Sequence, residues 1–419
     1  ARRAVLLPLL PLLLLALQFP LASGGDGGGG EVAWGHPQLS LFTTLLNDHI
    51  NRSQFPGDCR SARLLIAGLK DNEGMGSLLV SLGGALAEAL HSGRTLILSP
   101  NRVLYQGWHG DRCDPAADDH MGYHFDCIFE RMSGCSYDDV EAHERVGLVS
   151  GLASFDSSRV KIADMRRAGV ALFAPMRRYR ELLLPGDAAR LAWASTIVSH
   201  LFRPLPPLRR HADRLLRGIR RLRAAPLPPS PQGGWLRGLT AVHMRRGDLS
   251  LEDGEGNPRY PGRRPFDAQD YAGAVPKASR VVFWASDEVG SLPSYVDRIP
   301  ARCLYFAEPN KVNCDPSLRL GRRNATGRGP SGRYHFTILR PVKSQTHSEY
   351  KGAGVRTDED LEQTAHDSRM MTKATIEDML ILSESEHIVG TIQSSYDVIC
   401  ALLQFSKRID SLHRTEGAE

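Results

Sequence analysis

The chain has 419 residues, of which 42% are hydrophobic and 24% charged, and its formal net charge is +5. This composition is typical of a globular protein long enough for two domains. The charge excess is too small for a nucleic-acid tail or a polybasic membrane patch, and aromatic residues are not interleaved with the basic ones. We therefore expect no nucleic-acid partner.

The amino-terminal residues predict a targeting segment. Arg2 and Arg3 precede an apolar run from Val5 to Leu17, and small residues follow. Residues 1–23 are therefore interpreted as a secretory signal peptide or, if retained, a type II signal anchor. We expect the rest of the chain to lie in the secretory lumen (Golgi or endoplasmic reticulum) or to be secreted, with membrane contact only through a retained anchor. Residues 24–36 are Gly-rich and expected to be disordered.

The seven cysteines fit an oxidising compartment. Because the chain contains no C-x-x-C pair and its histidines are scattered, disulfides are favoured over a metal site. Sequons at Asn51 and Asn324 predict a glycoprotein. The cysteines group as Cys59 with Cys113, Cys127 and Cys135, as Cys303 with Cys314, and as Cys400, expected to be buried and unpaired in an apolar helix.

Residues 37–202 are predicted to form a first α/β domain. A strand over residues 63–69, a turn at Gly74 and Gly76, a helix over 77–91 and a strand over 94–98 make one βαβ unit. A nicotinamide-binding turn is not expected, because Leu79 stands at the third glycine position and no acidic residue ends the second strand. The turn either presents amides to an anion or acceptor, or is purely structural.

Residues 203–235 are interpreted as a Pro/Arg-rich connection, because residues 203–234 contain seven of the chain's 26 prolines. Residues 236–412 are then predicted to form a second α/β domain. Its expected strands cover residues 238–244, 280–285, 303–306 and 387–390, and its expected helices cover 266–277, 289–298, 372–383 and 395–407.

The most informative segment follows the strand that ends at Met244. In open α/β sheets, ligands bind at the carboxyl ends of the strands. Adjacent arginines there suit a diphosphate, because the guanidinium fork matches phosphate oxygens. Solvated arginines at a strand end are the alternative. The candidate residues are His243, Arg245, Arg246 and Asp248.

A second candidate segment lies near the carboxyl terminus. Ser394 is a predicted helix N-cap with Asp397 as its capping partner. The hydroxyl and amide groups of Gln393, Ser394 and Ser395 could hold phosphate oxygens, or could form a capped helix start only. Asp378 could accept from guanine N1–H and the exocyclic amine, or could favour its own helix dipole. The acidic run 358–360 is interpreted as a helix start rather than a metal site.

Taken in chain order, these motifs resemble the GDP-fucose-dependent fucosyltransferases of the α1,6/α1,2/protein O-fucosyltransferase superfamily. The resemblance covers roughly residues 60–100 and 236–405. It rests on Gly74-x-Gly76, on Arg94-Thr95-Leu96-Ile97-Leu98, on His243-x-Arg245-Arg246-Gly247-Asp248, and on Asp378 with Thr391-x-Gln393-Ser394-Ser395.

The resemblance implies an α/β, GT-B-like fold in which two Rossmann-type domains face a cleft. It also implies that fucose is transferred from GDP-fucose to a glycan or protein hydroxyl, with inversion and without a metal or other cofactor. The first domain would help present the acceptor and the second would bind the donor. Because Leu249 replaces the lysine of the core α1,6 enzymes, we do not expect the N-glycan core as acceptor.

The same resemblance assigns roles to individual residues. Arg245 would hold the β-phosphate, and Asp378 would recognise guanine. Glu252 or Asp253 matches the position of the base that deprotonates the acceptor. The alternatives are an inactive binding or scaffold protein on the same fold, and a transferase for another nucleotide sugar. The remaining nucleotide-sugar-binding candidates are Gly74, Gly76, His243, Arg246, Asp248, Gln393, Ser394 and Ser395.

Overall fold

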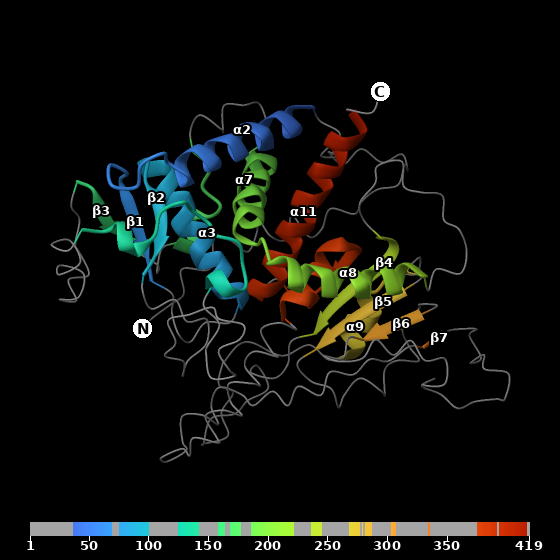
Figure 1. Ribbon diagram of the computed structural model, residues 1–419. Coiled ribbons are helices and arrows are strands. Elements are labelled where there is room, and N and C mark those ends of the chain that lie inside the picture. The colour runs from blue at the N-terminus through green and yellow to red at the C-terminus, as the bar shows by residue number, and fades with distance from the viewer. Residues whose placement is uncertain are drawn as a thin grey trace, which may run out of the picture. The chain divides into compact units, whose positions relative to one another are not determined.

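The structure, a computed structural model, shows two compact units, Ala1–Leu205 with Ala401–Glu419 and Pro206–Cys400 (Figure 1). Each contains a parallel sheet, which confirms the predicted α/β class. The predicted boundaries at residues 202 and 235 remain predictions. The structure describes residues 37–68, 75–99, 125–141, 158–163, 168–176, 186–221, 236–244, 268–276, 279, 281–286, 303–306, 334–335, 375–391 and 394–416.

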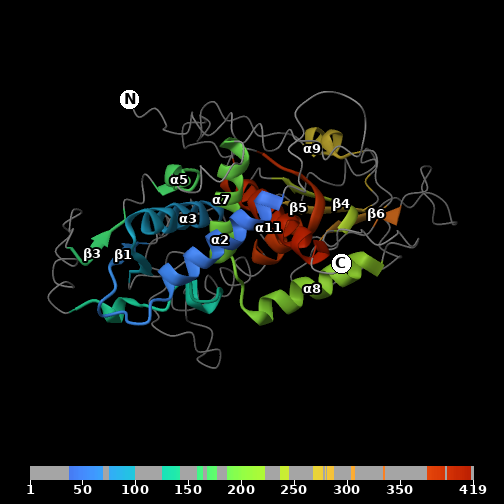
Figure 2. The same ribbon diagram turned by 90° about the horizontal axis from the view of Figure 1, so that it is seen from above.

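In the first unit, a helix packs on a short parallel sheet of strand order β2-β1-β3. Helix α3 contacts β1 and β2, and helix α7 contacts α2 and α3 (Figure 2). The predicted βαβ unit is thus present. Its described elements are α2 (Pro37–Gln54), β1 (Leu64–Ala67), α3 (Met75–Ser92), β2 (Thr95–Leu98), η1 (Phe125–Cys127), η2 (Tyr137–Asp139), β3 (Val160–Ile162), α5 (Ala168–Ala171) and α7 (Gly186–Leu201).

Arg94, one of the residues that carry the resemblance, has a structural role at the amino ends of these strands. Its buried guanidinium donates to the carbonyl oxygens of Leu64 at 3.1 Å and Arg159 at 2.8 Å. A third donation, at 3.5 Å, goes to Ser158. The Arg159 carbonyl also accepts from the backbone N–H of Leu64 at 2.7 Å, so Arg94 supplies it with a second donor and connects the segments that lead into β1 and β3.

A disulfide between Cys59 and Cys135 joins two segments of the first unit across 76 residues. Cys400 is buried and is not part of a disulfide. Both findings agree with the expected cysteine chemistry. The side chains of the other predicted cysteines lie outside the described part of the structure; they are Cys113, Cys127, Cys303 and Cys314.

The second unit is built on a parallel sheet of described strand order β7-β6-β5-β4-β8. Helix α9 contacts β4. The β4 side chains from Leu239 to Val242 are buried, as expected for a central parallel strand. The elements are α8 (Pro206–Arg221), β4 (Leu236–Met244), α9 (Ala268–Ala274), β5 (Val281–Ser286), β6 (Cys303–Phe306), β7 (Tyr334–His335), a helix over residues 375–384, β8 (Ser385–Val389) and the start of α11 (Ser395–Glu416), whose residues from Ala401 on belong to the first unit.

The strand order creates a topological switch point between β4 and β8. From β4 the chain adds β5, β6 and β7 outward on one side, and β8 then pairs with β4 on the other side. At such a point the connections leave in opposite directions, so the carboxyl ends of the two strands flank a crevice suited to ligands. His243 is the penultimate residue of β4, and Gly390 follows β8 directly.

Most of the predicted elements agree with the structure to within a few residues, but α11 continues to Glu416 instead of ending at 407, and the short strands β3 and β7 were not predicted. Residues 206–221, inside the predicted connection, form helix α8. Pro206 opens it, where proline is well tolerated because that N–H has no helical partner. The predicted helix over 289–298 and the segments 1–23 and 24–36 lie outside the described residues. None of the described helices has the length and apolarity required to cross a bilayer.

His200 makes the stability of the first unit depend on pH. It is 8% exposed, and its Nε2 lies 3.0 Å from the carbonyl oxygen of Met132. Burial, with the positive charge of Arg203, lowers the pKa of His200 from 6.5 to about 4. Below pH 6.5 the unfolded chain therefore takes up a proton that the folded chain accepts only near pH 4.

We expect the free energy of unfolding to fall as the pH drops from 6.5 to about 4, by up to about 3 kcal/mol from His200. Above this range His200 is neutral in both states, so its contribution is complete. Urea unfolding of the wild type and of His200→Gln should show a stability difference that narrows on acidification. A difference independent of pH would contradict this assignment.

Candidate functional site

A buried carboxylate, Asp397, connects the carboxyl ends of β4 and β8 to the start of α11. Its Oδ1 lies 2.6 Å from Nδ1 of His243. Its Oδ2 accepts from the backbone N–H of Thr391 at 2.7 Å and from the Thr391 hydroxyl at 3.3 Å. The two side chains are 4% (Asp397) and 14% (His243) exposed. Removed from water, this carboxylate depends on these donors.

The contact with Asp397 determines how His243 presents its ring. An ionised carboxylate only accepts hydrogen bonds, so we assign a proton to Nδ1. The ring also stacks on Tyr396, with centroids 4.2 Å apart and planes inclined by 29°. The Tyr396 hydroxyl donates to the carbonyl oxygen of Thr375 at 3.1 Å, which brings the helix over 375–384 to the same place. The imidazole is thus held on one edge and one face.

Gly390 is required by the approach of this carboxylate. A Cβ atom at position 390 would lie 2.6 Å from Cγ of Asp397 and 2.8 Å from each of its oxygens. Real Cβ contacts are not this short, so any larger residue must displace Asp397. The glycine after β8 therefore permits the turn to close over the carboxylate.

The start of α11 differs in part from the predicted capping box. Ser394 is buried, and its carbonyl accepts the first helical hydrogen bond from Val398 at 3.1 Å. Its hydroxyl accepts from the N–H of Asp397 at 3.5 Å, as an N-cap does. The Asp397 carboxylate does not return to the cap but binds His243 and Thr391. Sequence reasoning noticed Asp397 but assigned it a local role.

Asp378 and its neighbour Glu377 are buried carboxylates on the helix over 375–384. Asp378 lies one turn after Thr375, whose carbonyl receives the Tyr396 hydroxyl. Both residues take part in interactions in the structure. The hydrogen bond from the Tyr396 hydroxyl to the Thr375 carbonyl therefore brings the helix that carries Asp378 close to the start of α11.

The structure thus gathers part of the predicted site in the second unit. His243, Asp378, Ser394 and Ser395 lie on elements joined by the contacts of Asp397 and Tyr396. Gly76 is buried in α3, which belongs to the first unit. The predicted residues outside the described part of the chain are Gly74, Arg245, Arg246, Asp248, Glu252, Asp253 and Gln393. Arg245 follows Met244, the last residue of β4.

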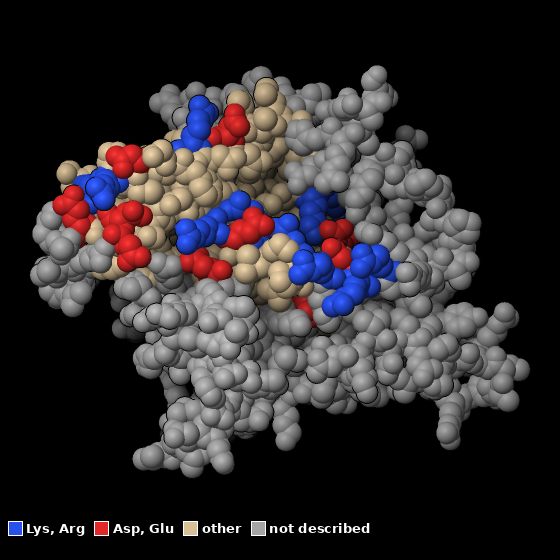
Figure 3. Space-filling model, in the orientation of Figure 1, with Lys and Arg blue, Asp and Glu red and all other residues tan. Residues whose placement is uncertain are grey.

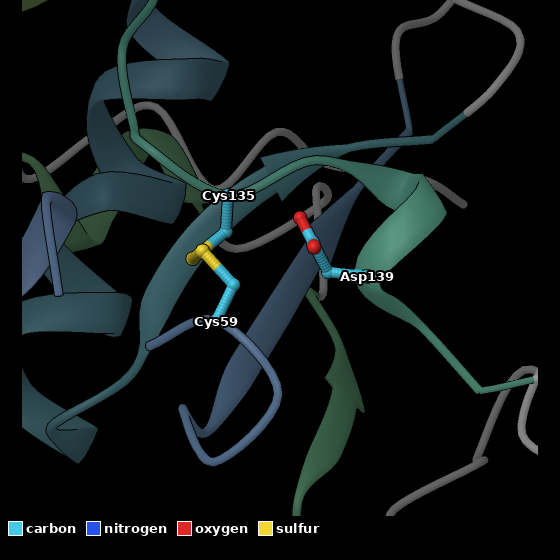
Figure 4. A group of neighbouring side chains, drawn as sticks. All are labelled: Cys59, Cys135 and Asp139. Atoms are coloured by element: carbon cyan, nitrogen blue, oxygen red, sulfur yellow. A yellow bond between two sulfur atoms is a disulfide. The ribbon is translucent and has the colours of Figure 1, made fainter. Parts of the chain in front are cut away.

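One group of three metal-ligand types occurs among the described residues, at Cys59, Cys135 and Asp139 (Figure 4). Its sulfur atoms are bonded to each other, so no thiolate is available to a metal. Oδ2 of Asp139 accepts from the backbone N–H of Ser136 at 2.7 Å and completes a capping box. The group is therefore structural. The acidic run 358–360 lies outside the described residues.

The arrangement around Asp397 suits an anionic ligand. A 22-residue helix, α11, begins at a switch point, and the first N–H groups of a helix attract anions. An imidazole with Nδ1 committed to Asp397 has its second nitrogen on the opposite edge of the ring. Hydroxyl groups of Ser394 and Ser395 lie at the same helix start. Backbone N–H and hydroxyl groups at a helix start are of the kind that binds phosphate oxygens in proteins.

Comparison with known proteins identifies one similar curated protein. No protein-family model matches the chain. Over 231 residues it is 25% identical to an α-(1,6)-fucosyltransferase of Drosophila melanogaster; this region is 52% of the chain and 31% of that protein. The chain thus spans about a third of the length of this relative. The predicted resemblance to fucosyltransferases is therefore confirmed.

Two solved structures are also similar to this chain. The crystal structure of NodZ α-1,6-fucosyltransferase soaked with GDP-fucose matches with a TM-score of 0.35 and 13% identity, over 82% of this chain and 93% of that one. A mutant of FUT1 from Arabidopsis thaliana in complex with GDP matches with a TM-score of 0.37 and 12% identity, over 93% of this chain and 85% of that one.

We expect Asp397→Asn and Gly390→Ala to destabilise the second unit through the same contact. The first replaces one of the two accepting oxygens by an NH2 group, so the side chain can no longer accept from both His243 and Thr391, and the second pushes the carboxylate away. Losing one partner of a buried pair costs about 3–5 kcal/mol, and we expect less, about 2 kcal/mol, for these mild changes. Urea unfolding measures both.

The double variant tests the shared cause. If both changes act through Asp397, the double variant should lose clearly less unfolding free energy than the sum of the losses in the two single variants. Asp213→Asn is a matched control, because Asp213 is exposed on α8 and loses the same charge. Full additivity, or an equal loss in the control, would show that Asp397 does not connect these elements.

Proposed function

We propose that this protein is a glycosyltransferase that moves fucose from GDP-fucose to a hydroxyl of a glycan or protein. The observation that carries the proposal is the His243–Asp397 contact at the β4–β8 switch point, beside the start of α11. It supports a diphosphate site directly before Arg245 and Arg246. The similarity to an α-(1,6)-fucosyltransferase supports the choice of donor. A luminal or secreted location is part of the proposal.

In this reaction the acceptor oxygen attacks the anomeric carbon of fucose on the face opposite the diphosphate. A new C–O bond forms as the bond to the β-phosphate oxygen breaks, and that oxygen takes the electron pair. Attack from the opposite face inverts the anomeric centre. The acceptor proton passes to a carboxylate, for which Glu252 and Asp253 are the candidates. GDP and the fucosylated acceptor are the products.

The proposed contribution of this chain is mainly electrostatic. Arg245 would meet the β-phosphate with its guanidinium fork and stabilise the departing GDP. The start of α11 would bind the same diphosphate, and the imidazole of His243, held by Asp397, would join it in the doubly protonated form, in which Nε2 also donates. Positive charge from these groups takes the place that a divalent cation has in metal-dependent transferases. Asp378 would select guanine by accepting from N1–H and the exocyclic amine. Two domains facing a cleft would present the acceptor opposite this site.

We expect GDP and GDP-fucose, but not UDP, to raise the thermal unfolding midpoint, and EDTA to leave the shifts unchanged. A ligand that binds only the folded state stabilises it by about 2.7 kcal/mol at one hundred times its Kd. A shift with GDP but no transfer to any acceptor in a glycan panel would indicate a binding protein. A UDP shift would indicate another donor, and no shift at all would overturn the nucleotide site.

We expect Arg245→Ala to lower kcat by about two to three orders of magnitude, because it removes charge stabilisation of the leaving group. The kcat of Arg245→Lys should lie between those of the wild type and Arg245→Ala, because lysine keeps the positive charge but lacks the planar guanidinium that binds two phosphate oxygens. Arg63→Ala, at an exposed arginine before β1, is the control. Unchanged turnover of Arg245→Ala, in protein with wild-type unfolding, would remove Arg245 from the mechanism.

A further inference from the structure

Helix α8 carries a large positive charge that the proposed reaction does not use. Its 16 residues, Pro206–Arg221, contain six arginines and one aspartate. Their formal charge of +5 equals the net charge of the whole 419-residue chain. The remainder of the chain is therefore neutral on balance, and the charge excess of the protein is concentrated in one helix.

The arginines of α8 form an exposed stripe along the helix. Arg210, Arg214 and Arg217 are all exposed, and their spacing of four and three residues places them on one face. The opposite face is apolar and packed, with Ala212 at 1% and Leu216 at 4% exposure. Blue side chains gather in Figure 3 where Figure 1 draws α8.

This stripe is not neutralised within the part of the chain that the structure describes. Arg210, Arg214 and Arg217 make no ion pair or hydrogen bond with another described residue. Like charges at these spacings destabilise a helix by about 0.2–0.5 kcal/mol per pair. The first turn of α8 also lacks the acidic residue that would favour its dipole. Asp213, exposed on the same face at three residues from Arg210 and four from Arg217, offsets part of this repulsion. The stripe keeps a net charge of +2, which an external polyanion would neutralise.

The packing and composition of α8 indicate which class of polyanion can bind the arginine stripe. A helix that lies on a membrane must bury its apolar face in lipid, whereas the apolar face of α8 is buried in the protein. Single-stranded nucleic acid is bound with aromatic side chains that stack on the bases, and α8 contains none. Guanidinium groups in a row match carboxylate or sulfate groups spaced along a linear chain.

We propose that the exposed arginine stripe of α8 binds a linear anionic glycan bearing sulfate or carboxylate groups. The preference for a glycan over an acidic peptide rests on the proposed function, because a transferase acting on glycans meets such chains at its acceptor. From Arg210 to Arg217 the helix rises about 10 Å, which brings three guanidinium groups within reach of one short oligosaccharide. The stripe increases the local concentration of anionic chains and makes their binding sensitive to salt.

The experiment is calorimetric titration of the full chain, without nucleotide, with a heparin decasaccharide over a range of salt concentrations. Arg210→Gln/Arg214→Gln/Arg217→Gln should raise Kd at least tenfold at 0.15 M salt. The slope of log Kd against log salt should become smaller by about two to three, one for each lost contact. Glutamine keeps helix propensity close to that of arginine, so α8 should persist.

The matched control is Arg52→Gln/Arg63→Gln/Arg190→Gln, which removes three exposed arginines outside α8. It should keep the wild-type Kd to within twofold. An equal loss in this control would show that binding follows net charge rather than the stripe. A third variant is Arg210→Lys/Arg214→Lys/Arg217→Lys. If the guanidinium geometry contributes, its Kd for the heparin decasaccharide should lie between those of the wild type and the glutamine variant.

Other probes separate the partner classes. Neutral dextran should not bind. Tighter binding of polyglutamate would assign the stripe to an acidic peptide, and tighter binding of phosphatidylserine vesicles would assign it to a membrane; either result overturns the glycan proposal. No binding of heparin overturns it as well. The GDP shift of the glutamine variant is a separate readout: it should equal that of wild type, and its absence in both proteins would contradict the proposed function alone.

Discussion

The candidate site depends on one buried negative charge. Asp397 is almost fully excluded from water and must be satisfied by donors from other segments, which are Nδ1 of His243 and the backbone and hydroxyl of Thr391. His243 lies at the carboxyl end of β4, and Thr391 lies just after the carboxyl end of β8. The same residue belongs to the first turn of α11, so its carboxylate also sets where that helix begins. Removing it would leave an imidazole and an amide without their acceptor.

The sheet explains why the charge lies where it does. A parallel sheet directs all its carboxyl ends to one edge, and the reversal of strand order between β4 and β8 opens that edge. In the proposed function, Arg245 and Arg246, which follow β4, are part of a donor site for a nucleoside diphosphate. The arginines of α8 belong to a different set, because they extend along an exposed helix face. One protein would thus recognise anions in two ways, as a compact diphosphate and as an extended chain.

Local sequence patterns predicted most of the helices and strands, but they could not predict contacts between residues that are far apart in the sequence. Apolar runs located β1, β2, β4 and α3 because a buried strand or helix needs such a run. Prolines suggested a connection where α8 forms, since proline favours a first turn as much as it breaks a helix interior. Asp397 was read as a cap because nothing in its neighbours points to His243, 154 residues earlier. The pairing of Cys59 with Cys135 likewise depends on the fold.

The most direct test of the central claim is a crystal structure of the chain with GDP. The diphosphate should lie at the carboxyl ends of β4 and β8, with His243 still bonded to Asp397 and the amide groups at the start of α11 directed at phosphate oxygens. Guanine should lie beside Asp378. GDP bound in the first unit, or a His243 ring turned away from Asp397 when the nucleotide is present, would contradict the account.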